Sequence, residues 1–95
     1  MTNKQFIVVV YDIPDDRRRT RLHTALLGFG TPVQFSVFEC WLDTEEQKKL
    51  RQRIAKIIRP RKDHVRTYVL CKSCAGRVQT TRAGELTVVK EVIVV

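Results

Sequence analysis

The chain has 95 residues, of which 43% are apolar and 29% charged, and its formal net charge is +8 at pH 7. A chain of this length has room for a single hydrophobic core, so we expect one domain over residues 1–95, and the apolar content excludes wholesale disorder. Its apolar runs are shorter than a membrane span and its start, MTNKQF, lacks the apolar region of a secretion signal, which predicts a cytoplasmic protein with no membrane partner.

The first predicted element is a strand over residues 5–11, which read QFIVVVY. The run is apolar and rich in β-branched residues, as in a central strand that is buried on both faces. A proline and two acids that suit the first turn of a helix come next, namely Pro14, Asp15 and Asp16. Apolar residues then recur at helical spacing until Gly30, so a helix is predicted over about residues 15–29.

Asp12 stands between these two elements, at the carboxyl end of the strand. One interpretation is a turn former that leads into the helix. The other is a metal ligand, because strand ends line the mouth of a fold and Mg²⁺, which keeps most of its waters, needs only one or two carboxylates. If a second copy of the chain places its own Asp12 nearby, the pair can hold one Mg²⁺ that generates hydroxide and neutralises charge on a phosphodiester.

Three arginines in the predicted helix are candidates for phosphate binding, namely Arg17, Arg19 and Arg21. A guanidinium fork matches the oxygens of a phosphate group. The alternative is ion pairs with acids of the same chain, for which Asp15, Asp16 and Glu39 are available. Surface pairs of that kind contribute only about 0–1 kcal/mol. His23 is a further candidate, as a general acid or base, although the sequence points to no residue that would orient it.

Residues 32–42 (PVQFSVFECWL) are apolar in both alternating sets, which predicts one strand with a face in the core and a face against another surface. Thr44 and Gln47 then have the spacing of a capping box. A second helix follows, with an apolar stripe formed by Leu50, Ile54, Ile57 and Ile58. Pro60 ends it.

The second helix and its end carry a run of basic residues without an acid, from Lys48 to Lys62. Such a run can be no more than a solvated helix face. Together with the arginines of the first helix, it favours nucleic acid over a membrane or an acidic protein as the partner. We take Lys49 and Arg53 as nucleic-acid-binding candidates, with the phosphate backbone of DNA or RNA as the ligand and without strong sequence specificity.

Residues 64–70 alternate and predict another strand, and residues 77–81 can form a short one. The order of elements matches an α+β, ferredoxin-like βαββαβ sandwich with a core over about residues 5–80. Residues 86–95 (LTVVKEVIVV) form a strongly β-prone tail that would aggregate unless it joined a sheet edge. If two copies exchange this strand, each strand can pair with a free edge of the partner's sheet. We therefore predict a homodimer whose C-terminal strands pack on the partner sheet.

The chain has 3 cysteines, Cys40, Cys71 and Cys74, and an odd count argues against a disulfide framework. Cys71 and Cys74 have CxxC spacing, which is half of a zinc site. Cys40 together with His23 or His64 would have to complete it. We favour small buried or turn cysteines instead.

Three segments together resemble one known family, namely YDIPDDRRRTRL (residues 11–22), FGTPVQFSVFECWL (29–42) and YVLCKSC (68–74). The family is that of the small second Cas core protein of CRISPR adaptation. The resemblance implies a ferredoxin-like homodimer, metal-dependent endonuclease activity on RNA or DNA, and a DNA-holding role beside the CRISPR integrase subunit in spacer acquisition. It implies that Asp12 is the metal-binding aspartate, that Tyr11 and Phe38 are catalytic positions, and that Arg19 and Arg21 are functional as well.

Two functions of different classes follow. In the first, a pair of Asp12 side chains holds Mg²⁺ and the protein hydrolyses phosphodiesters of single-stranded RNA or double-stranded DNA. In the second, the dimer is a non-catalytic scaffold that holds nucleic acid on its basic helices. A toxin-like ribonuclease with the same fold is a third hypothesis.

Overall fold

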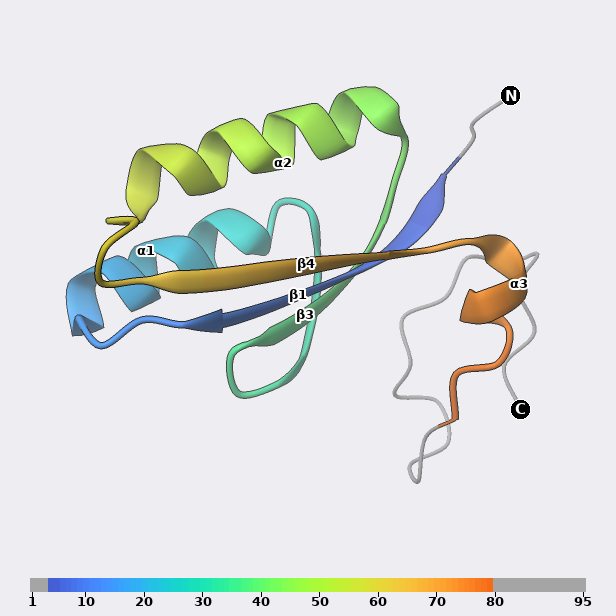
Figure 1. Cartoon of the computed structure of the whole chain (residues 1–95), viewed down its shortest axis with the longest axis horizontal. Helices are drawn as coiled ribbons and strands as arrows, with labels where there is room; N and C mark the ends of the chain where they lie inside the picture. Colours follow the sequence, from blue (N-terminus) through green and yellow to red (C-terminus); the bar gives the residue numbers. More distant parts are fainter. Residues whose placement is uncertain (1–3, 80–95) are drawn as a thin grey trace.

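The computed structural model describes residues 4–79 of the chain (Figure 1). The elements in chain order are β1 (Gln5–Asp12), α1 (Asp16–Leu26), β2 (Gly30–Gln34), β3 (Val37–Leu42), α2 (Thr44–Ile57), β4 (His64–Leu70) and α3 (Lys72–Ala75). In the described part of the chain, no helix has the length and apolar character that a membrane span requires. The C-terminal strand predicted over residues 86–95 lies outside the described residues.

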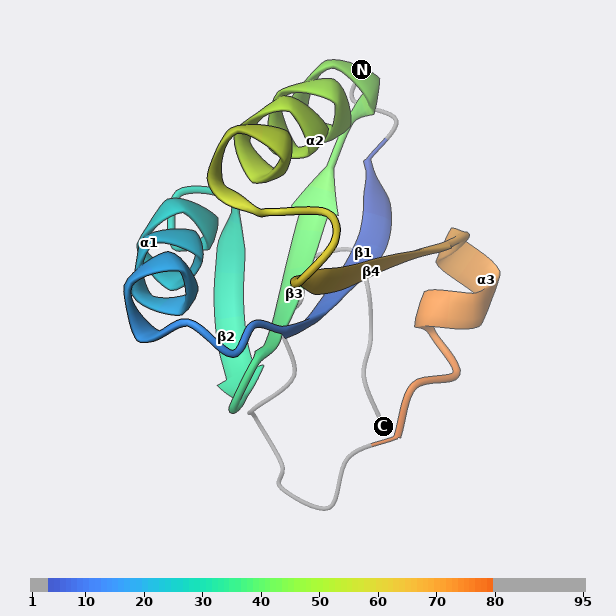
Figure 2. The same cartoon turned by 60° about the vertical axis from the view of Figure 1, so that its left-hand side comes forward.

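The strands form a 4-stranded sheet in the order β2-β3-β1-β4, and every neighbouring pair is antiparallel. The long helices α1 and α2 both lie on one face of this sheet (Figures 1 and 2). This arrangement is the predicted ferredoxin-like βαββαβ sandwich. The strand predicted over residues 64–70 has the predicted bounds in β4, and the first predicted strand extends one residue further, to Asp12.

The main core lies between the sheet and the two long helices. β1 contributes Ile7, Val9 and Tyr11, all buried, and the helices add Leu22, Leu26 and Leu50 among others. The opposite face of the sheet carries a smaller cluster of Phe6, Trp41 and Ala75, in which the rings of Phe6 and Trp41 are 5.1 Å apart. β1 therefore buries side chains on both faces, as predicted, because α3 covers one end of the second face.

The remainder of that second face has no helix over it among the described residues. Val8 and Val10 of β1 are half-buried there, and Tyr68 of β4 is 48% exposed. Their positions follow from the ladder, in which Val8 pairs with Tyr68 and Val10 with Arg66. We call this surface the open face of the sheet.

The single strand predicted over residues 32–42 is wrong, because β2 and β3 form a hairpin that turns at Phe35 and Ser36. Ser36 has a φ of 62°, a left-handed conformation that lets the chain reverse within this short turn. Its carbonyl oxygen accepts a hydrogen bond from the backbone N–H of Tyr11, at 3.1 Å. Apolar residues continue through both strands of the hairpin without a break. The hydrophobic period alone therefore does not indicate a turn at this place.

Gly30 marks the place where β2 meets β3 most closely. A Cβ atom on Gly30 would lie 2.3 Å from the carbonyl oxygen of Glu39 and 2.5 Å from Sγ of Cys40. The close approach therefore excludes a side chain at this position. The helix predicted to continue to residue 29 ends at Leu26, and a tight turn connects it to Gly30, in which Phe29 N–H donates to the Leu26 carbonyl at 2.9 Å.

The cap predicted at Thr44 is wrong by one residue. Asp43 caps α2, since its carboxylate accepts from the N–H of Glu46 at 2.8 Å while the Glu46 side chain accepts from the N–H of Asp43 at 2.9 Å. An acidic N-cap with Glu three residues later makes the same reciprocal box as Thr with Gln. The side chain of Gln47 instead donates to the Leu42 carbonyl, at 3.2 Å.

The short strand predicted over residues 77–81 is not formed by residues 77–79, and residues 80 and 81 lie outside the described range. The helix α3 precedes them, and its last turn continues through hydrogen bonds from Arg77 N–H to the Cys74 carbonyl and from Val78 N–H to the Ala75 carbonyl. Backbone groups that are engaged in this turn cannot pair with a strand.

A buried ion pair fastens α1 to the loop before β4. Arg18 donates to the carboxylate of Asp63 through Nε at 2.7 Å and through Nη2 at 2.9 Å. The Asp63 side chain has no exposed surface, and it also accepts from the N–H of Arg59 at 2.8 Å. These bonds, above all those from Arg18, hold the pKa of Asp63 below its usual value.

Replacing Asp63 with Asn is expected to lower the melting temperature by roughly 10 °C, because it leaves the Arg18 guanidinium without its counter-charge. The control is Glu45→Gln, which removes the same charge from an exposed position of α2. Since the native pKa of Asp63 lies below the unfolded one, its contribution is complete above about pH 4 and is lost as pH falls through the native pKa. Thermal melts should therefore converge for the wild type and the variant at low pH. A constant difference at every pH would contradict this account.

Candidate metal and nucleic-acid site

Tyr11 and Asp12 are neighbours in sequence, yet their side chains point to opposite faces of the sheet. Successive side chains of a strand alternate between faces, and Tyr11 belongs to the buried cluster beneath the helices. Asp12 is exposed at the end of β1 and pairs with His64 in the β1–β4 ladder. The side chains of these two predicted catalytic residues therefore lie on opposite faces, although both residues line one recess at the end of β1.

Asp12 lines a shallow recess of about 210 Å³, together with Val10 and Tyr11 of β1 and with three residues of β4, namely His64, Arg66 and Tyr68. These three β4 residues lie on one face of the strand, and His64 Nε2 lies 3.4 Å from Nε of Arg66. The recess combines a carboxylate, an imidazole and a guanidinium. Such groups can respectively hold a hard cation, accept a proton and bind a phosphate oxygen.

Among residues 4–79, no three or more His, Cys, Asp or Glu side chains gather closely enough to hold a metal ion. Among residues 4–79, Asp12 is the one carboxylate that lines this recess. That donor suits Mg²⁺, which retains waters and takes few protein ligands, and it does not suit a metal that needs a complete protein cage. Residues 4–79 bring no second carboxylate to the recess.

Tyr11 and Phe38 lie together on the helix-covered face. The Tyr11 hydroxyl is 3.4 Å from Nδ1 of His23, and the His23 ring meets the Phe38 ring edge-on with centroids 5.1 Å apart. Burial raises the pKa of Tyr11, while a hydrogen bond with Ser36 and the charge of Arg19 oppose that rise. Phe38 has no exposed surface, so any contribution that it makes is through the position of Tyr11 and His23 and not through contact with a substrate.

The contact with Tyr11 supplies the orienting partner of His23 that the sequence did not indicate. The two residues are separated by 12 positions in the chain. Sequence spacing carries no signal for such a pair, because only the packing of α1 on β1 brings the rings together. His23, the candidate general acid or base, therefore lies with Tyr11 on the helix-covered face of the sheet.

The predicted arginines divide into one that is fixed and two that are exposed. Arg19 forms a salt bridge with Asp16 and donates through Nη1 to the Ile13 carbonyl at 3.0 Å. Arg17 and Arg21 are exposed and form no salt bridge with any residue between 4 and 79. The alternative of pairing with Asp16 therefore applies to Arg19, and the charges of the other two face solvent.

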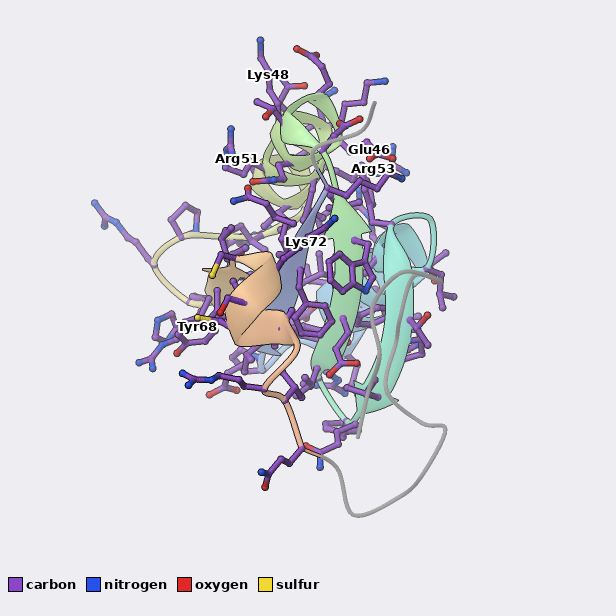
Figure 3. The ribbon with its side chains drawn as sticks, turned by 90° about the vertical axis from the view of Figure 1, so that its right-hand side faces the viewer. Glu46, Lys48, Arg51, Arg53, Tyr68 and Lys72 are labelled. Carbon is purple, nitrogen blue, oxygen red and sulfur yellow. The ribbon has the colours of Figure 1, made fainter. Side chains whose placement is uncertain are left out.

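A basic groove lies between α1 and α2. It has a volume of about 450 Å³, and its lining includes Arg21 of α1 with Arg53 and Lys56 of α2. Lys49 lies one turn before Arg53 on the same side of α2. Lys48 and Arg51 project from α2 on other sides, and Figure 3 shows Arg51 and Arg53 on opposite sides of the helix. The structure thus brings together the predicted binding residues Arg21 and Arg53, with Lys49 beside them.

The amino-acid pattern of one protein family, described as "CRISPR associated protein Cas2", matches residues 5–78. The chain belongs to the Cas2 family. Two curated relatives are CRISPR-associated endoribonuclease Cas2 3 of Chloroflexus aurantiacus, 46% identical over 78% of this chain and 80% of the relative, and CRISPR-associated endonuclease Cas2 2 of Thermus thermophilus, 39% identical over 94% of each. The family identified from the sequence segments is therefore confirmed.

Two solved structures have the same fold. The crystal structure of Streptococcus pyogenes Cas2 aligns with a TM-score of 0.71 at 29% identity, and covers 81% of this chain and 99% of that one. A hypothetical protein of Thermus thermophilus aligns with a TM-score of 0.70 at 41% identity, over 72% of this chain and 83% of that one. Both support the ferredoxin-like assignment.

The cysteines of this Cas2 chain do not converge. Cys40 is buried in the core beneath the helices, where burial first and the charge of Glu39 second raise its pKa to about 11. Cys71 caps α3, and its Sγ accepts from the N–H of Cys74 at 3.4 Å, a bond that lowers the Cys71 pKa. Since α3 packs on the other face of the sheet, Cys40 cannot complete a zinc site with them, so the zinc hypothesis built on Cys40 is wrong. Cys71 and Cys74 are turn cysteines and Cys40 is a buried one.

Proposed function

We propose that this Cas2 protein acts in the cytoplasm during CRISPR spacer acquisition as a homodimer that holds DNA beside the integrase subunit. We further propose that the dimer is a Mg²⁺-dependent endonuclease whose metal is shared by the Asp12 side chains of two copies. The observation that carries the proposal is the position of Asp12, exposed at the end of the central strand on the side of the sheet that α1 and α2 leave uncovered.

The open face is the surface on which a second copy would pack. It presents the half-buried side chains of Val8 and Val10 and the exposed ring of Tyr68, an apolar surface that is costly to leave in water. A small domain gains stability when such a face is covered by a partner. In a two-fold dimer both copies contribute the same surface patch, and a residue meets its own counterpart only near the axis, so the proposal places Asp12 close to that axis.

Mg²⁺ bound there would supply an activated water and neutralise charge on the phosphodiester. The residues of the recess would bind the metal, accept a proton and bind the phosphate. Asp12 provides a carboxylate oxygen, His64 across the ladder can accept a proton, and Arg66 can bind a non-bridging phosphate oxygen. The relatives named above are called endoribonuclease and endonuclease, which agrees with phosphodiester hydrolysis.

The DNA-holding role depends on the other side of the molecule. The basic groove between α1 and α2 faces away from the open face, so a dimer formed through the open face leaves two such grooves at its surface. Lys and Arg side chains in a groove bind phosphates without regard to sequence. A non-catalytic scaffold is the second candidate function, and it is favoured by the contrast between one exposed carboxylate at the strand end and many basic side chains on the helices.

Replacing Asp12 with Asn is expected to reduce Mg²⁺-dependent cleavage by about 10³-fold, because the metal loses its protein ligand. Duplex binding should not change. Cleavage of single-stranded RNA and double-stranded DNA is measured with the wild type, Asp12→Asn and the control Glu45→Gln, all purified identically, with Mg²⁺ and with EDTA. Equal Mg²⁺-dependent cleavage by the wild type and Asp12→Asn would refute the catalytic proposal and trace the activity to a contaminating nuclease.

Replacing Arg21 and Arg53 together with Gln is expected to flatten the salt dependence of duplex binding. If each contacts one phosphate of B-DNA, the slope of log K against log salt falls in magnitude by about 0.9 per residue. The matched control is Lys48→Gln with Arg51→Gln, which removes the same net charge from other sides of α2. Affinities are measured by anisotropy of a labelled duplex across a salt series. Equal changes of slope in both double variants would show that net charge, and not the groove, binds the duplex.

A further inference from the structure

A second pocket lies on the side of β1 opposite to Asp12, between α1 and the β2–β3 turn. It has a volume of about 230 Å³. The residues that matter for its chemistry are Tyr11, Arg19, His23, Gln34, Phe35 and Ser36. The metal site proposed above uses neither this pocket nor this face of the sheet.

The polar groups of this pocket are held in place by other parts of the fold. The Arg19 guanidinium is fixed by Asp16 and by the carbonyl of Ile13, which leaves its remaining N–H groups available. The Tyr11 hydroxyl lies 3.4 Å from Nδ1 of His23. If the hydroxyl donates to Nδ1, the neutral imidazole carries its proton on Nε2 and offers a second donor. The pocket thus presents donors from a guanidinium and an imidazole, the groups that bind phosphate oxygens.

The rim of the pocket carries an aromatic ring that the protein does not bury. Phe35 is 86% exposed, the largest exposure given for any large apolar side chain among the described residues. The ring stands at the turn of the β2–β3 hairpin, next to Ser36 with its φ of 62° and its hydrogen bond to the backbone of Tyr11. A non-glycine residue with a positive φ is strained, and such strain persists where the surrounding structure holds it. The turn therefore holds the backbone of Phe35 beside the phosphate-binding groups, and the exposed ring offers a flat apolar surface there.

A flat aromatic ring beside a guanidinium is the combination that binds single-stranded nucleic acid, because every base has a face that can stack and every nucleotide has a phosphate. The volume of about 230 Å³ lies below the roughly 300–1,000 Å³ of pockets for drug-sized ligands. The enclosed space therefore suits the backbone of one nucleotide, and the base would lie outside it on Phe35. A base that is already paired in a duplex has both faces stacked and is not free to do this.

We propose that this pocket binds one unpaired nucleotide, with its phosphate at Arg19 and His23 and its base stacked on Phe35. The proposal rests on the proposed function only in taking nucleic acid as the ligand, and it needs neither Asp12 nor a metal. It gives the protein two modes of binding. The basic groove holds the backbone of a duplex, and the pocket selects a strand end or a gap where a base is free.

Replacing Phe35 with Ala is expected to weaken binding of single-stranded oligonucleotides about tenfold, because one base loses its stacking surface. Binding of a blunt duplex should stay within about twofold. Phe35→Trp preserves the aromatic surface and should restore single-strand affinity. Leu27→Ala, at the exposed apolar C-cap residue of α1 outside the pocket lining, serves as the control for a loss of apolar surface.

The measurement is fluorescence anisotropy in EDTA with three labelled probes, namely oligo-dT, oligo-U and a blunt duplex of equal length. A parallel titration uses a strand with 2-aminopurine, whose fluorescence should be quenched on binding to the wild type and to Phe35→Trp and not to Phe35→Ala. Equal affinity of wild type and Phe35→Ala for both single strands would overturn the proposal, as would equal losses on single strand and duplex. Since EDTA removes any metal, failure of Asp12-dependent cleavage and failure of this test are distinguishable.

Discussion

Consecutive side chains of a β-strand point to opposite faces of its sheet, and this alternation governs what β1 presents at its carboxyl end. The helices α1 and α2 cover one face, so Tyr11 is buried among core residues and reaches His23, while Asp12 remains exposed near the open face. Two adjacent residues of β1 thus place a tyrosine hydroxyl on one face of the sheet and a carboxylate on the other. A metal ion shared through Asp12 would bind on the open face. Arg19 and His23 of α1 lie with Tyr11 on the helix-covered face.

The position of α1 determines which groups gather on the helix-covered face of the sheet, and the Arg18–Asp63 pair holds α1 in that position. Its two bonds of 2.7 and 2.9 Å join α1 to the segment that leads into β4, while Arg17, Arg19 and Arg21 are left for other tasks. Arg19 is then held at the pocket rim, and Arg21 faces α2 across the basic groove. Arg18 therefore has a structural role, and it lies in the sequence between Arg17 and Arg19, which are candidates for phosphate binding.

Several parts of this account were accessible from the sequence. The bounds of β4 follow from strict alternation, and Asp12 stands out because an acid ends an apolar run. The hairpin turn at Phe35 and Ser36 was not accessible from hydrophobicity, since apolar residues continue through both arms. The Arg18–Asp63 pair spans 45 positions, and the Tyr11–His23 contact depends on helix packing, so spacing rules of a single element could not find either. The strand period predicts that Tyr11 and Asp12 point to opposite faces of the sheet. Only the structure shows which of these faces the helices cover.

The central claim is that two copies of the chain share one metal ion between their Asp12 carboxylates. A titration of the metal-free protein with Mn²⁺, which takes the same oxygen ligands as Mg²⁺ and is followed by its electron paramagnetic resonance signal, tests this most directly. We predict saturation at one Mn²⁺ per two chains in the wild type and no specific binding in Asp12→Asn. Saturation at one ion per chain, or equal binding by the variant, would contradict the account.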